Sequence, residues 1–160
     1  MSENISYYLM PHPPIILPDI GKGEEKKAIR TIEACQIIGE EIKNKDPETI
    51  VIITSHGVMF KDCLTISYDD EISGDLSRFN ARNIKMNKLI DKDLTYEIYN
   101  LSLENDIPIL KINNKELRKY HRHLELDHGS IVPLSFIEGN YKIVHITYGL
   151  INPLDLFKFG

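Results

Sequence analysis

A nearly unbroken apolar run from Thr49 to Thr54 constrains the fold of this chain more than any other feature of its sequence. The run is Thr-Ile-Val-Ile-Ile-Thr, and it follows shortly after a break at Asp46-Pro47. Runs of this kind are typical of parallel strands that are covered on both faces. The sequence therefore predicts a buried parallel strand here and an α/β fold around it.

The segments before this strand predict the rest of a βαβ unit. Ile5 to Met10 are mostly aromatic or apolar and end at Pro11, which is typical of a first strand. Between residues 24 and 44, apolar side chains recur at steps of three and four residues, which predicts an amphipathic helix. Strand, helix and strand in this order favour a parallel sheet.

The rest of the chain predicts further elements of the same fold class. We expect strands at 64–68, 108–112 and 142–147, helices at 87–105 and 130–137, an irregular excursion at 69–86 and a helix start at Asn152-Pro153. The prediction is one α/β domain over residues 1–160, with three α/β/α layers on a mainly parallel sheet. Because the last helix has barely begun when the chain stops, we expect the front part of a longer domain.

Composition and charge exclude several classes of function. The net charge is -5 and no cluster of cations dominates, which argues against a nucleic-acid partner. The two cysteines, Cys35 and Cys63, have no CxxC spacing, so a cysteine-based zinc or redox site is not expected. No signal peptide or membrane-spanning run is visible, so we expect a cytoplasmic protein with no membrane partner.

His12 and His56 occupy matching positions, because each follows the end of a predicted strand. Ligands collect outside the carboxyl ends of the strands in open α/β sheets. Neighbouring strands lie about 4.8 Å apart, so two histidines at matching ends can bind one metal ion. The pattern predicts a shared metal site, although a single loop histidine is more often polar surface.

His128 is the third candidate, in Asp127-His128-Gly129 ahead of a predicted short helix. It could transfer protons near neutral pH, or it could order the loop, and spacing alone does not choose between these roles. His121 and His123 are expected on the surface. His145 lies in the last predicted strand and is expected to be a hydrogen-bonded core residue.

Three segments together resemble a known family. They are Met10 to Gly21, which contains Pro-His-Pro-Pro, Thr54 to Gly57, and Leu126 to Leu134, which contains Asp-His-Gly-x-x-Val-Pro-Leu. They are similar to motifs of the class III extradiol ring-cleavage dioxygenases of the B-subunit type, and the similarity runs through essentially the whole chain. Gly74 to Phe79 also resembles a segment of a microbial branch related to Memo-like proteins.

The resemblance implies an oxidoreductase that uses non-haem iron(II) and O2 to open a catechol-type aromatic ring. It implies that His12 and His56 are metal ligands and that His128 is the acid–base catalyst. The family completes its two-histidine, one-carboxylate triad with a residue from a longer domain. Asp19, Asp62 and Asp127 lie near the expected site in sequence, but none matches that ligand.

Two other functions stay open. The chain could be a Memo-like module that binds a metal or a small ligand without ring cleavage, or a hydrolase that uses zinc or another divalent metal. With one ligand missing, we expect a site that is empty of metal or only partly liganded by the protein. We also expect an exposed apolar patch on the incomplete side, or a homo-oligomer or partner chain that covers it.

Overall fold

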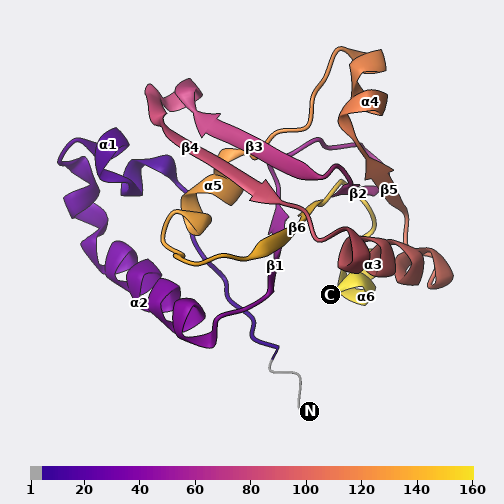
Figure 1. Cartoon of the computed structure of the whole chain (residues 1–160), viewed down its shortest axis with the longest axis horizontal. Coiled ribbons are helices and arrows are strands. Elements are labelled where there is room, and N and C mark those ends of the chain that lie inside the picture. Colours follow the sequence, from indigo (N-terminus) through magenta and orange to yellow (C-terminus); the bar gives the residue numbers. More distant parts are fainter. Residues whose placement is uncertain (1–4) are drawn as a thin grey trace.

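A four-stranded sheet lies at the centre of the computed structural model, which describes residues 5–160. The strand order is β1-β6-β2-β5, and the bounds are Thr49–Thr54 for β1, Lys142–Thr147 for β6, Leu64–Ser67 for β2 and Ile109–Ile112 for β5 (Figure 1). The pairs β1–β6 and β2–β5 are parallel, whereas β2 and β6 are antiparallel. The predicted mixed α/β fold on a mainly parallel sheet is therefore confirmed.

Helices flank this sheet (Figure 1). The α-helices are α1 (Pro18–Gly21), α2 (Ile29–Lys45), α3 (Lys92–Glu104), α4 (Asn114–Leu117), α5 (His128–Leu134) and α6 (Pro153–Phe159). Short 3-10 turns are η1 (Pro14–Ile16), η2 (Glu24–Ala28), η3 (Ser77–Phe79) and η4 (Arg118–Tyr120). None of the described helices is long and apolar enough to cross a membrane.

Strand β6 separates two hydrophobic cores, because successive side chains of a strand point to opposite faces. Ile143 belongs to the core that contains residues of α2 and α5, such as Cys35 and Ile131. Val144 belongs to the second core, against which side chains of α3 and α6 pack. Cys35 is buried, as the sequence predicted.

The predicted first strand does not form. Residues 5–10 have no strand assignment, and Tyr7 and Leu9 are 85% and 96% exposed. Tyr8 and Met10 still pack against the first core. A strand needs a partner as well as suitable residues, and within residues 5–160 no strand pairs with this segment. The predicted βαβ unit at the N-terminus is therefore wrong.

Strand β1 has the predicted bounds but not the predicted burial. It is an edge strand that pairs with β6 alone, and Val51 and Ile53 are 46% and 52% exposed. Its apolar composition did not reveal this position, because the order of strands in a sheet depends on distant segments. The preceding helix also differs from the prediction, since residues 24–28 form η2 and α2 begins at Ile29.

Residues 69–86, predicted to be irregular, contain most of a β-hairpin. Strands β3 (Glu71–Leu76) and β4 (Ala81–Leu89) pair in antiparallel register, and η3 joins them. Ile72 and Leu76 are buried whereas Glu71, Ser73 and Asp75 are exposed, which is the alternation of a half-buried strand. Because β4 continues to residue 89, α3 begins later than the predicted residue 87.

The later elements follow the prediction more closely. Strands β2, β5 and β6 lie within one residue of their expected bounds at either end, and α5 overlaps the short helix predicted at 130–137. Asn152 caps α6, since its side chain accepts a hydrogen bond of 2.9 Å from the Leu154 backbone N–H. Exposed apolar side chains occur in this region, at Leu150, Leu154 and Phe157.

Candidate metal and acid–base site

The side chains of His12 and His56 meet although their segments are distant in sequence. His12 lies in an irregular segment among prolines, just before η1, and not at the end of a strand as predicted. His56 lies two residues beyond the carboxyl end of β1. Their Nε2 atoms are 3.0 Å apart and their ring centroids 5.0 Å apart. The expected juxtaposition of these two histidines is confirmed.

His128 completes a group of three imidazoles. It is the first residue of α5, and its ring centroid lies 4.1 Å from that of His56 and 6.0 Å from that of His12. One nitrogen from each of the three rings can be chosen so that all lie within 4.8 Å of one another. The prediction that His128 faces the same site is confirmed.

The spacing of the first two histidines suits a metal ion. Two ligand atoms that bind one ion at about 2.1 Å with a right angle between them lie about 3.0 Å apart, and a tetrahedral angle would separate them by about 3.4 Å. The 3.0 Å between the Nε2 atoms of His12 and His56 matches the right-angled arrangement. The spacing of these two imidazoles therefore suits a divalent transition metal. The group of three could hold such an ion, and in residues 5–160 it includes no carboxylate.

His128 has a chemical environment that favours its neutral form. Burial and the neighbouring His56 imidazole lower the pKa of His128 below its ordinary value of 6.5, and the opposing attraction of Asp127 is smaller than the burial effect. A neutral imidazole can bind a metal or accept a proton near neutral pH. Phe79 from η3 contacts this ring edge-on, with centroids 5.1 Å apart.

The acids near the site have other partners. Asp127 accepts hydrogen bonds from Thr54 Oγ1 at 2.7 Å and from Ser130 Oγ at 3.2 Å, and it contacts His145 Nε2 at 3.2 Å. Burial opposes its ionisation, but these hydrogen bonds outweigh burial and lower the pKa of Asp127 to about 2. Asp19 accepts a hydrogen bond from Asn83.

The other histidines lie where the sequence predicted. His145 is 1% exposed, and its Nδ1 lies 2.9 Å from Ser67 Oγ. His121 and His123 are exposed, and His123 contacts Glu125 at 3.0 Å. The contact of His145 with Asp127 was not foreseen, because the two residues lie on different elements of the fold.

Gly129 has a function that sequence reasoning missed. A Cβ atom at this position would lie 2.6 Å from Thr54 Oγ1 and 3.0 Å from His56 Cδ2. The first of these distances is too short for a real Cβ atom and the second is unusually tight, so the glycine allows α5 to approach the loop of His56. The Asp-His-Gly motif contained this signal, since a glycine beside a candidate site residue often marks close backbone approach.

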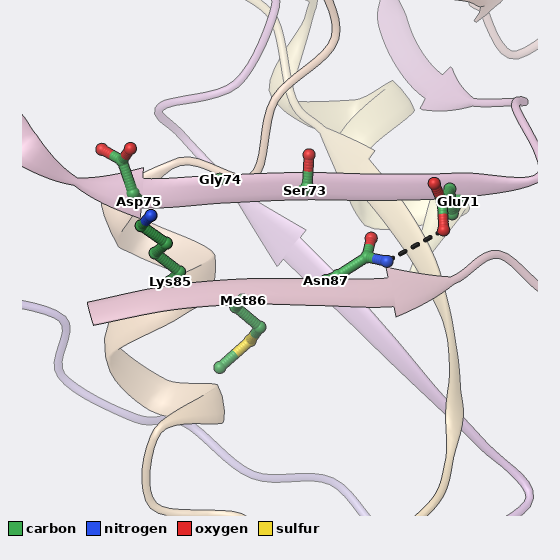
Figure 2. Close-up of a pocket in the computed structure, with 7 residues that line it drawn as sticks. All are labelled: Glu71, Ser73, Gly74, Asp75, Lys85, Met86 and Asn87. Atoms are coloured by element: carbon green, nitrogen blue, oxygen red, sulfur yellow. Dashed lines mark hydrogen bonds between the residues drawn. The ribbon is translucent and has the colours of Figure 1, made fainter. Parts of the chain in front are cut away.

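An open hollow on the β3–β4 hairpin does not coincide with the histidines. It is lined by Glu71, Ser73, Gly74, Asp75, Lys85, Met86 and Asn87. In Figure 2, polar side chains project from both strands, and Asn87 donates a hydrogen bond of 2.8 Å to Glu71. The three imidazoles, rather than this hollow, bring together groups that can do chemistry.

Comparison with known proteins gives two findings. A family model described as the catalytic LigB subunit of aromatic ring-opening dioxygenase matches residues 6–160. Protein CA_C1420 of Clostridium acetobutylicum is 45% identical over 163 aligned residues, which cover 100% of this chain and 35% of that protein. The chain thus spans about a third of the length of this curated relative.

Proposed function

This chain belongs to the family of the catalytic LigB subunit of aromatic ring-opening dioxygenases, and on that premise we propose that it provides the histidines of an iron(II)-dependent extradiol ring-cleavage site. The substrates would be a catechol-type aromatic compound and O2. The observation that supports this proposal is the convergence of His12, His56 and His128, with ligand atoms within 4.8 Å of one another. A carboxylate from outside this group would complete the triad.

The proposal gives the three histidines different roles. His12 and His56 bind the ion through nitrogens that are 3.0 Å apart. Bound iron(II) would acidify a catechol hydroxyl and hold the catechol beside O2. His128 then accepts the hydroxyl proton on its unprotonated ring nitrogen, and its lowered pKa keeps that nitrogen available near neutral pH.

An anaerobic assay tests the proposed function. The protein is loaded with iron(II) under argon, mixed with a panel of catechols and then exposed to O2, and absorbance reports the yellow ring-fission product. We expect product with at least one catechol and none without iron. His121→Ala is the matched control, since His121 is an exposed histidine outside the group of three. Failure of every catechol under iron saturation would contradict the proposal.

A second candidate is a metal-dependent hydrolase. The observation that favours it is the group of three histidines without a carboxylate in residues 5–160, because three imidazoles form the ligand set of some catalytic zinc sites. His128 would then be a third ligand rather than an acid–base catalyst. Zinc-dependent ester hydrolysis without ring cleavage would support this candidate. Tight metal binding with neither activity would favour a Memo-like binding module.

A further inference from the structure

The buried histidine His145 has no role in the proposed chemistry, yet it connects to the site. It lies on β6 and is 1% exposed. Its Nε2 contacts Asp127 Oδ2 and Ser130 Oγ, each at 3.2 Å, and its Nδ1 lies 2.9 Å from Ser67 Oγ. Both ring nitrogens therefore have partners in the interior, where an unpaired polar group would be costly.

The directions of these hydrogen bonds follow from the chemistry of the partners. An ionised carboxylate only accepts hydrogen bonds, so Nε2 of His145 must donate to Asp127. In the neutral ring, Nδ1 then accepts a hydrogen bond from the Ser67 hydroxyl. The two partners hold the imidazole from both ends, and β2 and β6 fix its position in the centre of the sheet.

Asp127 continues the connection towards two of the three site histidines. Its Oδ1 accepts a hydrogen bond of 2.7 Å from Thr54 Oγ1, and the same hydroxyl oxygen accepts a bond of 3.1 Å from the His56 backbone N–H. Asp127 also directly precedes His128 at the start of α5. One continuous set of hydrogen bonds thus runs from His145 through Asp127 and Thr54 to the His56 backbone, and the chain itself joins Asp127 to His128.

We propose that His145 is a positioning residue, which holds Asp127 and Thr54 so that the rings of His56 and His128 keep the separation that metal binding and proton transfer require. This inference rests on the proposed function of the three histidines. The loop that carries His56 packs tightly against β6. A Cβ at Gly57 would collide with Thr147 and lie 3.3 Å from His145 Cε1, so the loop of His56 packs directly on this histidine.

The first test compares two substitutions of His145 with a control on the same strand. His145→Leu removes the donor to Asp127, whereas His145→Gln keeps an N–H donor near the position of Nε2. Val144→Ala is the control, because Val144 is the adjacent residue and belongs to the second core. The dissociation constant for iron(II) is measured anaerobically in each variant, together with the thermal midpoint.

Loss of a group that orients ligand residues typically weakens metal binding by roughly 10- to 100-fold. We expect a loss of that size in His145→Leu, near wild-type binding in His145→Gln, and a lower thermal midpoint without weaker binding in Val144→Ala. Iron binding in His145→Leu that matches Val144→Ala would overturn the proposal, because it would leave His145 with a structural role alone.

The second test needs no metal. Hydrogen exchange of the His56 backbone amide reports the bond to Thr54, and we expect faster exchange in His145→Leu but not in Val144→Ala. Thr54→Val removes the hydroxyl and keeps the side-chain volume, so it should speed exchange of the His56 amide as His145→Leu does. It replaces His145→Leu in this test if His145→Leu does not fold. Unchanged exchange of the His56 amide in both His145→Leu and Thr54→Val would refute the inference. Absence of iron binding or turnover in the wild type would instead refute the proposed function.

Discussion

The three histidines of the proposed site differ in how they are positioned. His12 and His56 approach through their Nε2 atoms, whereas His128 is placed by the start of a helix and has its pKa lowered by burial and by His56. A metal ligand and a proton acceptor both need a neutral imidazole, so the protonation state alone does not separate these roles. Substitution can separate them.

Substitution of a metal ligand should mainly weaken iron(II) binding, whereas substitution of the acid–base residue should mainly lower turnover. His12→Ala and His56→Ala should each weaken iron(II) binding by more than about 100-fold, because even changes outside the ligand set cost about 10- to 100-fold. His128→Ala should keep most of the affinity and lose roughly 10²- to 10⁴-fold in turnover, the usual range for a general acid–base group. Anaerobic titration and the catechol assay measure both quantities. Equal loss of metal in all three variants would favour the three-histidine hydrolase site.

Asp127 predicts a pH dependence of stability. Its pKa is lowered in the folded protein from 3.8 to about 2, so the unfolded chain binds more protons between these values. The ionised carboxylate of Asp127 contributes on the order of 2 kcal/mol to the free energy of unfolding. This contribution is complete above pH 3.8 and is lost as the pH falls through about 2. Urea unfolding at pH 2 to 5 measures it. Asp127→Asn should flatten this dependence, whereas Glu97→Gln, an exposed control, should not.

At the scale of elements, Asp91 links α3 to the edge strand β1. Its Oδ1 accepts a hydrogen bond of 3.1 Å from the Leu94 backbone N–H, and its Oδ2 accepts one of 2.5 Å from Thr49 Oγ1. The first bond caps α3, and the second holds the start of β1. An edge strand that pairs with β6 alone gains from such a connection, since it has only one ladder of backbone bonds.

Loss of this cap should destabilise the protein more than loss of a nearby charge. Asp91→Ala should lower the free energy of unfolding by about 1–2 kcal/mol, because it removes a helix cap and one further hydrogen bond. Asp93→Ala is the control, since Asp93 is exposed in the same turn and contributes through the helix dipole, worth at most about 1 kcal/mol. Chemical denaturation compares the two. Equal effects would contradict a capping role for Asp91.

At the scale of the whole molecule, β6 couples the two cores. Ile143 and Val144 are both fully buried but belong to different cores on opposite faces of the sheet. Ile143 and Val144 are neighbours on β6, and β6 pairs with β1 on one side and β2 on the other. Lost packing in either core should therefore destabilise the whole sheet.

Cooperative unfolding follows from this arrangement. Ile143→Ala should cost about 2–5 kcal/mol, and Val144→Ala somewhat less, because each leaves a cavity. In both variants, far-UV circular dichroism and tyrosine fluorescence should report one coincident transition. Leu150→Ala, at a residue that is 75% exposed, is the control and should change the stability by less than about 0.5 kcal/mol. Separate transitions for the two probes would mean that the cores unfold independently.

The sequence by itself determined the features that depend on neighbouring residues. The apolar runs fixed the bounds of β1 and β6, and Asn152-Pro153 indicated the start of α6, because propensity and capping act over a few residues. The motifs of His12, His56 and His128 also identified the three imidazoles that meet. The sequence predicted residues 69–86 to be irregular and so missed the hairpin of β3 and β4, because Gly74 and Asp75 within β3 are residue types that are uncommon in strands.

Only the tertiary structure decided the features that need a distant partner. Residues 5–10 have strand-forming side chains but find no strand to pair with in the described chain. Val51 and Ile53 are exposed on β1, which the sheet order puts at the edge. The connection from His145 through Asp127 to His56 joins β6, the start of α5 and the end of β1. Hydrogen bonds between such distant segments depend on how the chain packs, and local sequence patterns do not specify that packing.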